Sequence, residues 1–205
     1  MNKVTSIKTK KNKSLKGRKN VEKRLIDSAA ELVGSIGPNQ LTIRDIADHA
    51  GVNHAQIHHY FGGKQGLLEA TYKQLAFEHM QQLERRNIGV MNLGNEPLSG
   101  LTENYFNALI RAVLDDQMDL LRVQVDSGLS MSKKTLNELT KLRGASKPSA
   151  EEKAAIALVM VLEFGFAAIK PYITEVLKIS DKDMKEFMKL FIEGRKLGLN
   201  KLKKK

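Results

Sequence analysis

Cysteine and tryptophan are absent from this chain of 205 residues, and it has only four prolines. Without cysteine the chain can form no disulfide, no thiolate metal site and no cysteine nucleophile. The absence is compatible with a cytoplasmic protein, the location that we expect.

Long apolar runs are also lacking. The longest, residues 154–169, is shorter than the about 20 residues that cross a bilayer and contains Glu163. The basic N-terminus is not followed by the apolar segment that a secretory signal contains. We therefore expect no interaction with a membrane.

Acidic residues are outnumbered by basic ones, 23 to 34, and the net charge of +11 is unevenly placed. Residues 1–24 hold ten Lys or Arg and one acid, a net +9, which leaves +2 for the rest of the chain. We predict that residues 1–19 are a disordered basic arm. Such an arm either keeps the chain soluble or binds polyanions such as DNA, and its composition leaves both readings open.

No segment alternates apolar and polar residues over the length of a strand, so we predict an all-α fold. Helices are expected at about 20–36, 64–86, 98–114, 118–129, 136–142 and 149–170, with a last one from residue 180. The helix at 149–170, where Ser149 and Glu152 can form a capping box, should end before Pro171. The helix at 98–114 is apolar nearly all round and should be buried. A Gly- and Pro-containing loop is expected at 87–100.

Residues 41–68 predict two short helices about a tight turn. Thr42 can cap the first helix, and Asp45 three residues later completes a capping box. Gly51 is placed to end that helix in the left-handed conformation. Asn53 can cap the second helix, whose outward side is polar. Two capped helices about an Ala-Gly-Val turn form a helix-turn-helix.

These residues resemble the N-terminal signature of the TetR/AcrR repressors. The resemblance rests on Thr42 to Ala47, Ala50-Gly51-Val52, Tyr60-Phe61, Lys64 and Leu67-Leu68, within residues 21–70. It implies a three-helix helix-turn-helix head at 20–66, joined by a long helix to a C-terminal helical body for effector binding and dimerisation at 67–205. It also implies a DNA-binding regulator, associated with the nucleoid.

The head supplies the candidate DNA-binding residues. The start of the first short helix offers hydroxyl and guanidinium donors for phosphate, and the second offers amide and imidazole groups for base edges. Lys64 matches the family's phosphate-contacting lysine. The candidates are Thr42, Arg44, His54, Ala55, Gln56, His58, His59, Tyr60 and Lys64.

Three histidines in this set suggest two further hypotheses. His54 and His58 have the i, i+4 spacing of metal ligands, but no third ligand follows in register, so we expect no metal. Protonation of these histidines near pH 6 would strengthen DNA binding.

The body shows no catalytic constellation, because no His follows His79 and no phosphate-binding loop is present. We expect neither an enzyme nor a cofactor. Apolar helices with few polar residues favour a pocket for a small apolar or amphipathic effector. The candidate effector-binding residues are Tyr105, Asn107, Arg111, Gln124, Asp126 and Glu163.

The last two helices are expected to form a homodimer interface, because the first of them is too apolar for one monomer layer. The candidates are Met160, Glu163, Phe164, Gly165, Phe187 and Phe191. The predicted function is a transcriptional regulator that an effector releases from a palindromic operator on double-stranded DNA. The alternative is a DNA-bound scaffold that acts through protein partners without an effector.

Overall fold

The computed structural model describes residues 3–88 and 102–203, and every element in these ranges is an α-helix. The head comprises α1 (Lys3–Ile36), α2 (Ile43–Ala50) and α3 (Ala55–Phe61). Helix α4 (Lys64–Arg85) leads from the head into the body. The predicted all-α fold with a helix-turn-helix head is confirmed.

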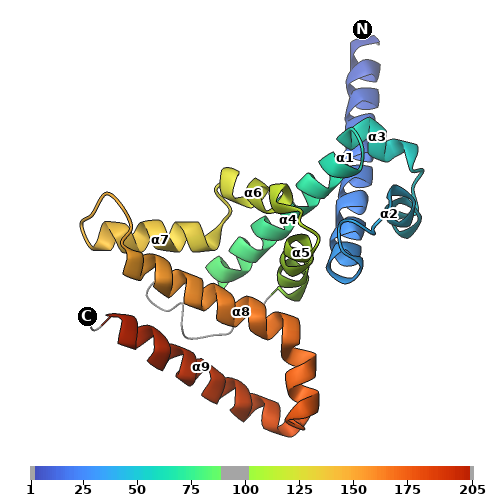
Figure 1. The fold of residues 1–205 in the computed structure, drawn as a ribbon. Coiled ribbons are helices and arrows are strands. Elements are labelled where there is room, and N and C mark those ends of the chain that lie inside the picture. The colour runs from blue at the N-terminus through green and yellow to red at the C-terminus, as the bar shows by residue number, and fades with distance from the viewer. Residues whose placement is uncertain (1–2, 89–101, 204–205) are drawn as a thin grey trace.

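Within residues 102–203, the body contains five helices in two groups. Next to α4 lie α5 (Glu103–Leu114) and α6 (Met118–Asp126). An outer layer follows, formed by α7 (Met131–Leu142), α8 (Ala150–Val176) and α9 (Asp181–Lys203). Figure 1 shows α9 running antiparallel to α8 on the side of α8 away from the head. The loop predicted at 87–100 falls largely on residues 89–101, outside the described residues.

One hydrophobic core extends from the head into the body. Leu25, Ile46 and Ile57, one from each head helix, are fully buried, and so are Leu67 on α4 and Leu120 on α6. The hydroxyl of Tyr72 on α4 donates to the carbonyl of Ala108 on α5, at 2.9 Å, inside this core. Head and first body layer are therefore packed against each other by the same apolar side chains.

Helix α1 begins at Lys3, where we had expected a disordered arm and a helix start at Asn20. Lysine has high helix propensity, and no proline interrupts residues 1–37, so the helix can continue backward from its buried part. Arg18 and Glu22 add an i, i+4 ion pair at 2.7 Å. The basic segment thus projects from the head as a helix (Figure 1).

Two expectations about the body helices were wrong. Helix α8 continues through Pro171 to Val176, and Figure 1 shows that it bends. The proline removes the helical hydrogen bond to the carbonyl of Ala167. Ala167 is half-buried and residues 168–172 beside it are exposed, so water can satisfy the freed carbonyl. Helix α5 is not buried all round, because Val113 and Leu114 at its C-terminal end are 56% and 72% exposed.

Gly66 is required by the junction between α3 and α4, a constraint that the sequence pattern does not reveal. A Cβ atom at Gly66 would lie 2.0 Å from the carbonyl oxygen of Phe61 and 3.1 Å from its carbonyl carbon. Both are backbone atoms and cannot rotate away. Only glycine lets the first turn of α4 approach the end of α3 this closely.

Changing Gly66 to Ala should therefore destabilise the chain by about 2–3 kcal/mol, because the helices must separate. Urea unfolding followed by circular dichroism would measure the effect. Gly194 on α9 is the matched control, since a Cβ there meets no atom within 4 Å. Gly194→Ala should be neutral or stabilising by up to about 1 kcal/mol. Equal stability of Gly66→Ala and the unmodified chain would contradict the close approach.

Candidate nucleic-acid interface and ligand cavity

The N-terminus of α2 is fixed by the predicted capping box. The Thr42 hydroxyl accepts from the amide of Asp45 at 3.1 Å, and the Asp45 carboxylate accepts from the Thr42 amide at 2.9 Å. The Thr42 hydroxyl also donates to the Asp45 carboxylate at 2.6 Å. This hydrogen bond and the one from the Thr42 amide lower the pKa of Asp45. Gly51 ends α2 in the left-handed conformation, with φ of 62°. The local signals in the sequence are thus confirmed at both ends of α2.

Helix α3 begins one residue later than its cap predicts. The side-chain oxygen of Asn53 accepts from the amide of Ala55 at 2.8 Å, and Ile57 is the buried anchor of the helix. The predicted DNA-binding residues of the head divide by exposure. Six are exposed and three are half-buried; the exposed ones are Thr42, Arg44, His54, Ala55, His58 and His59, and the half-buried ones are Gln56, Tyr60 and Lys64.

The turn between α2 and α3 is held from outside by Arg24 on α1. Its guanidinium donates to the carbonyl oxygens of Ala50 and Gly51, the latter at 3.1 Å. A cation at these carbonyls also interacts favourably with the negative, C-terminal end of the α2 dipole. Further along α1, the Arg18 guanidinium lies over the Tyr60 ring, 5.3 Å from its centroid. Sequence reasoning missed both contacts, because they join residues 26 or more positions apart.

Lys64 takes part in a polar cluster that joins the head to the body. Its ammonium donates to the carbonyl of Asn39 at 3.1 Å, and burial lowers its pKa. The Asn39 amide N–H donates to the carboxylate of Asp115 at 2.8 Å, and the Asn39 side chain donates to the carbonyl of Asp115 at 3.0 Å. Gln117 donates to the Asn39 side chain at 2.8 Å. We call Asn39, Lys64, Asp115 and Gln117 the Asn39 cluster.

The predicted effector residues are only partly brought together. Tyr105 and Glu163 line one cavity, and Gln124 accepts from the Tyr105 hydroxyl at 2.7 Å. Asn107 and Arg111 instead line an open groove between α1, α5 and α8. Asp126 is exposed. The structure therefore does not place all six around one cavity, because the residues lie on different faces of their helices.

The cavity lies between α4, α5, α7 and α8. Its wall is largely apolar or aromatic, and its lining residues are His79, Tyr105, Phe106, Met131, Ser132, Thr135, Ile156, Val159, Met160, Glu163 and Phe164. Sequence reasoning had identified two of these residues as effector contacts.

His79 is the core histidine that the pattern of α4 favours, and it also lines this cavity. It is 3% exposed, its ring stacks on Tyr105 with centroids 4.3 Å apart, and its Nδ1 lies 2.6 Å from the Thr102 hydroxyl. Burial lowers the pKa of His79 to about 4. The ring is therefore neutral at pH 7.

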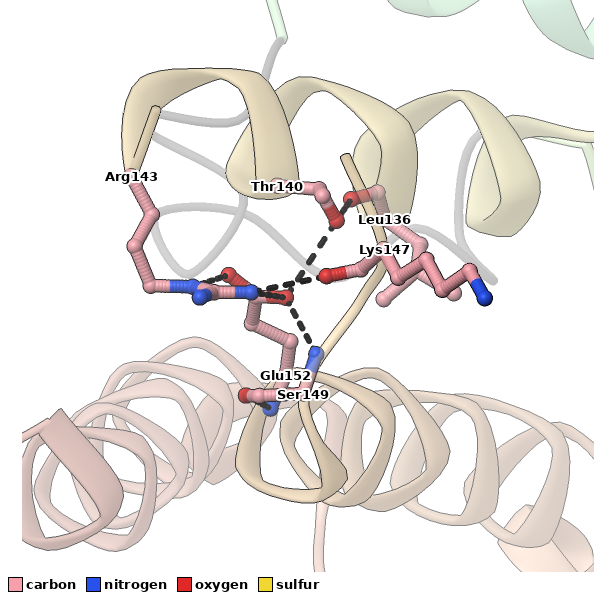
Figure 2. A network of polar contacts seen from close by, with 6 residues as sticks. All are labelled: Leu136, Thr140, Arg143, Lys147, Ser149 and Glu152. Atoms are coloured by element: carbon pink, nitrogen blue, oxygen red, sulfur yellow. Dashed lines mark hydrogen bonds and ion pairs between the residues drawn. The ribbon is translucent and has the colours of Figure 1, made fainter. Parts of the chain in front are cut away.

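Two walls of the cavity, α7 and α8, are joined at their ends by a polar network around Glu152 (Figure 2). The Glu152 carboxylate accepts from the Arg143 guanidinium at 2.7 Å, from the Thr140 hydroxyl at 3.2 Å and from the Ser149 amide at 2.8 Å. Chiefly because of the hydrogen bonds from Arg143 and Ser149, the pKa of Glu152 falls to about 2. The predicted capping box of α8 thus also positions α7.

The predicted dimer residues do not share one surface. Glu163 is buried, and Phe164 packs on Phe106 at 5.1 Å between ring centroids, so both face the interior. Phe187 and Phe191 are half-buried against Phe166. Met160 is 39% exposed and Gly165 is half-buried. Treating α8 as uniformly apolar led to this mixture of inward and outward positions.

The described residues contain no candidate metal site, but they contain one helix that is apolar enough to cross a membrane. Within residues 3–88 and 102–203, no three His, Asp or Glu side chains gather where they could hold a metal ion. Helix α8 is long and apolar enough to span a bilayer by length and composition, although core helices of soluble proteins meet the same criterion. Val161, Ile169 and Val176 leave apolar surface of α8 exposed.

Residues 25–71 match the family described as "Bacterial regulatory proteins, tetR family". Over 86 residues the chain is 37% identical to the HTH-type transcriptional regulator BetI of Brucella anthropi, which covers 42% of this chain and 44% of that protein. Over 52 residues it is 46% identical to BetI 2 of Chromohalobacter salexigens, covering 25% of each. The match thus spans less than half the length of these curated relatives.

Among solved structures, the fold is similar to that of a HlyIIR mutant protein in which one segment is substituted by a linker with two thrombin sites. The TM-score is 0.55 at 18% identity, over 85% of this chain and 96% of that one. A likeness at this identity shows a shared fold alone. It extends beyond the head to the helical body.

Folding should depend on pH through His79. The pKa of about 4 in the folded chain, against 6.5 unfolded, means that only the unfolded chain binds this proton between these values. Because the folded chain keeps His79 neutral, the free energy of unfolding is highest above pH 6.5. It falls by up to about 3 kcal/mol as the pH is lowered toward 4. The free energy of unfolding of His79→Gln should fall less over this window. Equal slopes in urea titrations of the two proteins would contradict the buried neutral ring.

Proposed function

We propose that this chain, a TetR-family regulator by its N-terminal domain and its fold, binds a palindromic operator as a homodimer and is released by a small-molecule effector. The exposed polar face of α3, held by the caps of α2 and by Arg24, is the observation that carries the proposal. In such a head, α3 enters the major groove, and the start of α2 contacts phosphates. The proposed location is the cytoplasm, on nucleoid DNA.

A symmetric dimer would use the outer face of α8. Ala157, Val161, Ala168 and Tyr172 follow one another at helical spacing and are all exposed. Val161 and Glu163 are two residues apart, and a rotation of roughly 200° between them places one outside and the other in the cavity. The outer stripe, and not the residues that line the cavity, is therefore the proposed contact with the second protomer.

Helix α4 connects the cavity to the head. His79 lies in the cavity wall, and Lys64 at the start of the same helix joins the Asn39 cluster. A ligand that favours one position of α4 would also favour one spacing of the two heads. Such a ligand acts only through its different affinity for the two arrangements.

The test is selection of bound fragments from random DNA by the full chain at about 150 mM salt. A palindrome with half-sites about one DNA turn apart is expected, because the two α3 helices of a dimer must enter adjacent major grooves. A variant with Lys8, Lys10, Lys11 and Lys13 changed to Gln should select the same palindrome more weakly. Loss of all sequence preference would instead favour the DNA-bound scaffold.

Two further variants separate phosphate contacts from base contacts in this assay. Arg44→Gln should weaken binding to all sequences alike and reduce the slope of affinity against salt by about one. Gln56→Ala should relax the preference at one position of each half-site by about 1–3 kcal/mol. The same effect for both variants would contradict the assigned roles.

The α8 stripe makes a separate prediction. Val161→Glu should yield monomers in sedimentation experiments and lose operator binding, since two carboxylates would meet across the symmetry axis. Leu142→Glu is the control, because Leu142 is 70% exposed, as Val161 is 66%, but lies on α7 away from the stripe. A Val161→Glu protein that stays dimeric would show that the interface lies elsewhere.

A further inference from the structure

Two polar side chains interrupt the apolar wall of the cavity between α4, α5, α7 and α8. Glu163 on α8 is 2% exposed, and Thr135 on α7 is 1% exposed; both line the cavity. The Thr135 hydroxyl has no hydrogen-bond partner among the described residues. Burying a polar atom in this way is unfavourable, so the wall contains a hydrogen-bonding position that a ligand can satisfy.

Aromatic rings form the other side of this cavity. His79 stacks on Tyr105, and Phe106 meets the His79 ring edge-on with centroids 5.4 Å apart. The negative faces of aromatic rings attract a cation that has left water. Because His79 is neutral at pH 7, its ring adds no positive charge that would oppose one.

From the Glu163 carboxylate, the Thr135 hydroxyl and the surrounding rings, we infer that the cavity binds a protonated primary or secondary amine with an apolar body. The positive charge pairs with Glu163 and lies near aromatic faces, and an ammonium N–H can donate to Thr135. The apolar body contacts the apolar and aromatic side chains that line the cavity. This inference specifies the effector class and rests on the proposed function only for the effect on DNA.

Other ligand classes fit the wall less well. None of the residues that line the cavity is a Lys or Arg that could pair with an anion. A neutral hydrocarbon would leave the Thr135 hydroxyl without a hydrogen-bond partner. A quaternary ammonium supplies the charge but has no N–H to donate. The buried Glu163 carboxyl group and the buried Thr135 hydroxyl together therefore favour an amine that has at least one N–H to donate.

Calorimetry on the full chain, without DNA, can test this with three probes that share one apolar body. These are 4-phenylbutylamine, 4-phenyl-1-butanol and trimethyl(4-phenylbutyl)ammonium. The amine should bind at least tenfold more tightly than the alcohol and several-fold more tightly than the quaternary ion. Equal binding of amine and alcohol would overturn the charge pairing, and a preference for the quaternary ion would overturn the hydrogen bond. No binding of the amine at 1 mM would overturn the inference as a whole.

Variants should locate the interaction. Glu163→Gln, which preserves shape, should lower the affinity for the amine at least tenfold and leave that for the alcohol unchanged. Thr135→Val should lower the affinity for the amine several-fold while the chain stays folded. Glu151→Gln, on the exposed start of α8, is the control and should change neither. Amine binding that neither cavity variant alters would overturn the placement.

The effect of the amine on operator binding is measured in a separate experiment. Amine binding with unchanged operator affinity would leave the cavity assignment intact and count against effector release. Amine binding that lowers operator affinity, with the effect lost in Glu163→Gln, would support both. Operator binding without amine binding would overturn the inference and leave the head assignment standing.

Discussion

The structure depends on the burial of one helix, α4, along nearly its whole length. Leu67 and Leu68 at its start belong to the head core, Tyr72 and Leu75 pack in its middle, and Leu83 near its end is buried in the body. A close-packed helix cannot move at one end only, because its neighbours tolerate little change of volume. The position of the head is therefore mechanically linked to the layer that forms the cavity.

The Asn39 cluster adds a directional constraint to this apolar contact. Apolar packing alone permits small sliding between helices, whereas the hydrogen bonds from Asn39 to Asp115 fix the head against the end of α5. Lys64 joins the same cluster from α4. Three elements distant in sequence thus meet at one asparagine, and a shift of any one must lengthen or break these bonds. This geometry provides a discrete contact that two head positions could make differently.

The sequence predicted what is locally encoded. The capping boxes of α2 and α8 and the left-handed Gly51 need only residues a few positions apart, and the structure confirms them. It did not predict the Asn39 cluster or the close approach at Gly66, because these depend on elements that come together only in the fold. It also failed where one helix has two apolar faces, since the composition of α8 cannot show which face lies inside.

The cavity explains the main departures from an otherwise consistent apolar pattern. His79, Thr135 and Glu163 are buried polar residues on three different helices. The Thr135 hydroxyl has no hydrogen-bond partner in the part of the chain that the structure describes, so its burial lowers the stability of the fold. All three line the same cavity. Local choices that conflict with folding tend to lie where function requires them. Their convergence at one place, in contact with the helix that carries the head, therefore favours a ligand site over a defect of packing.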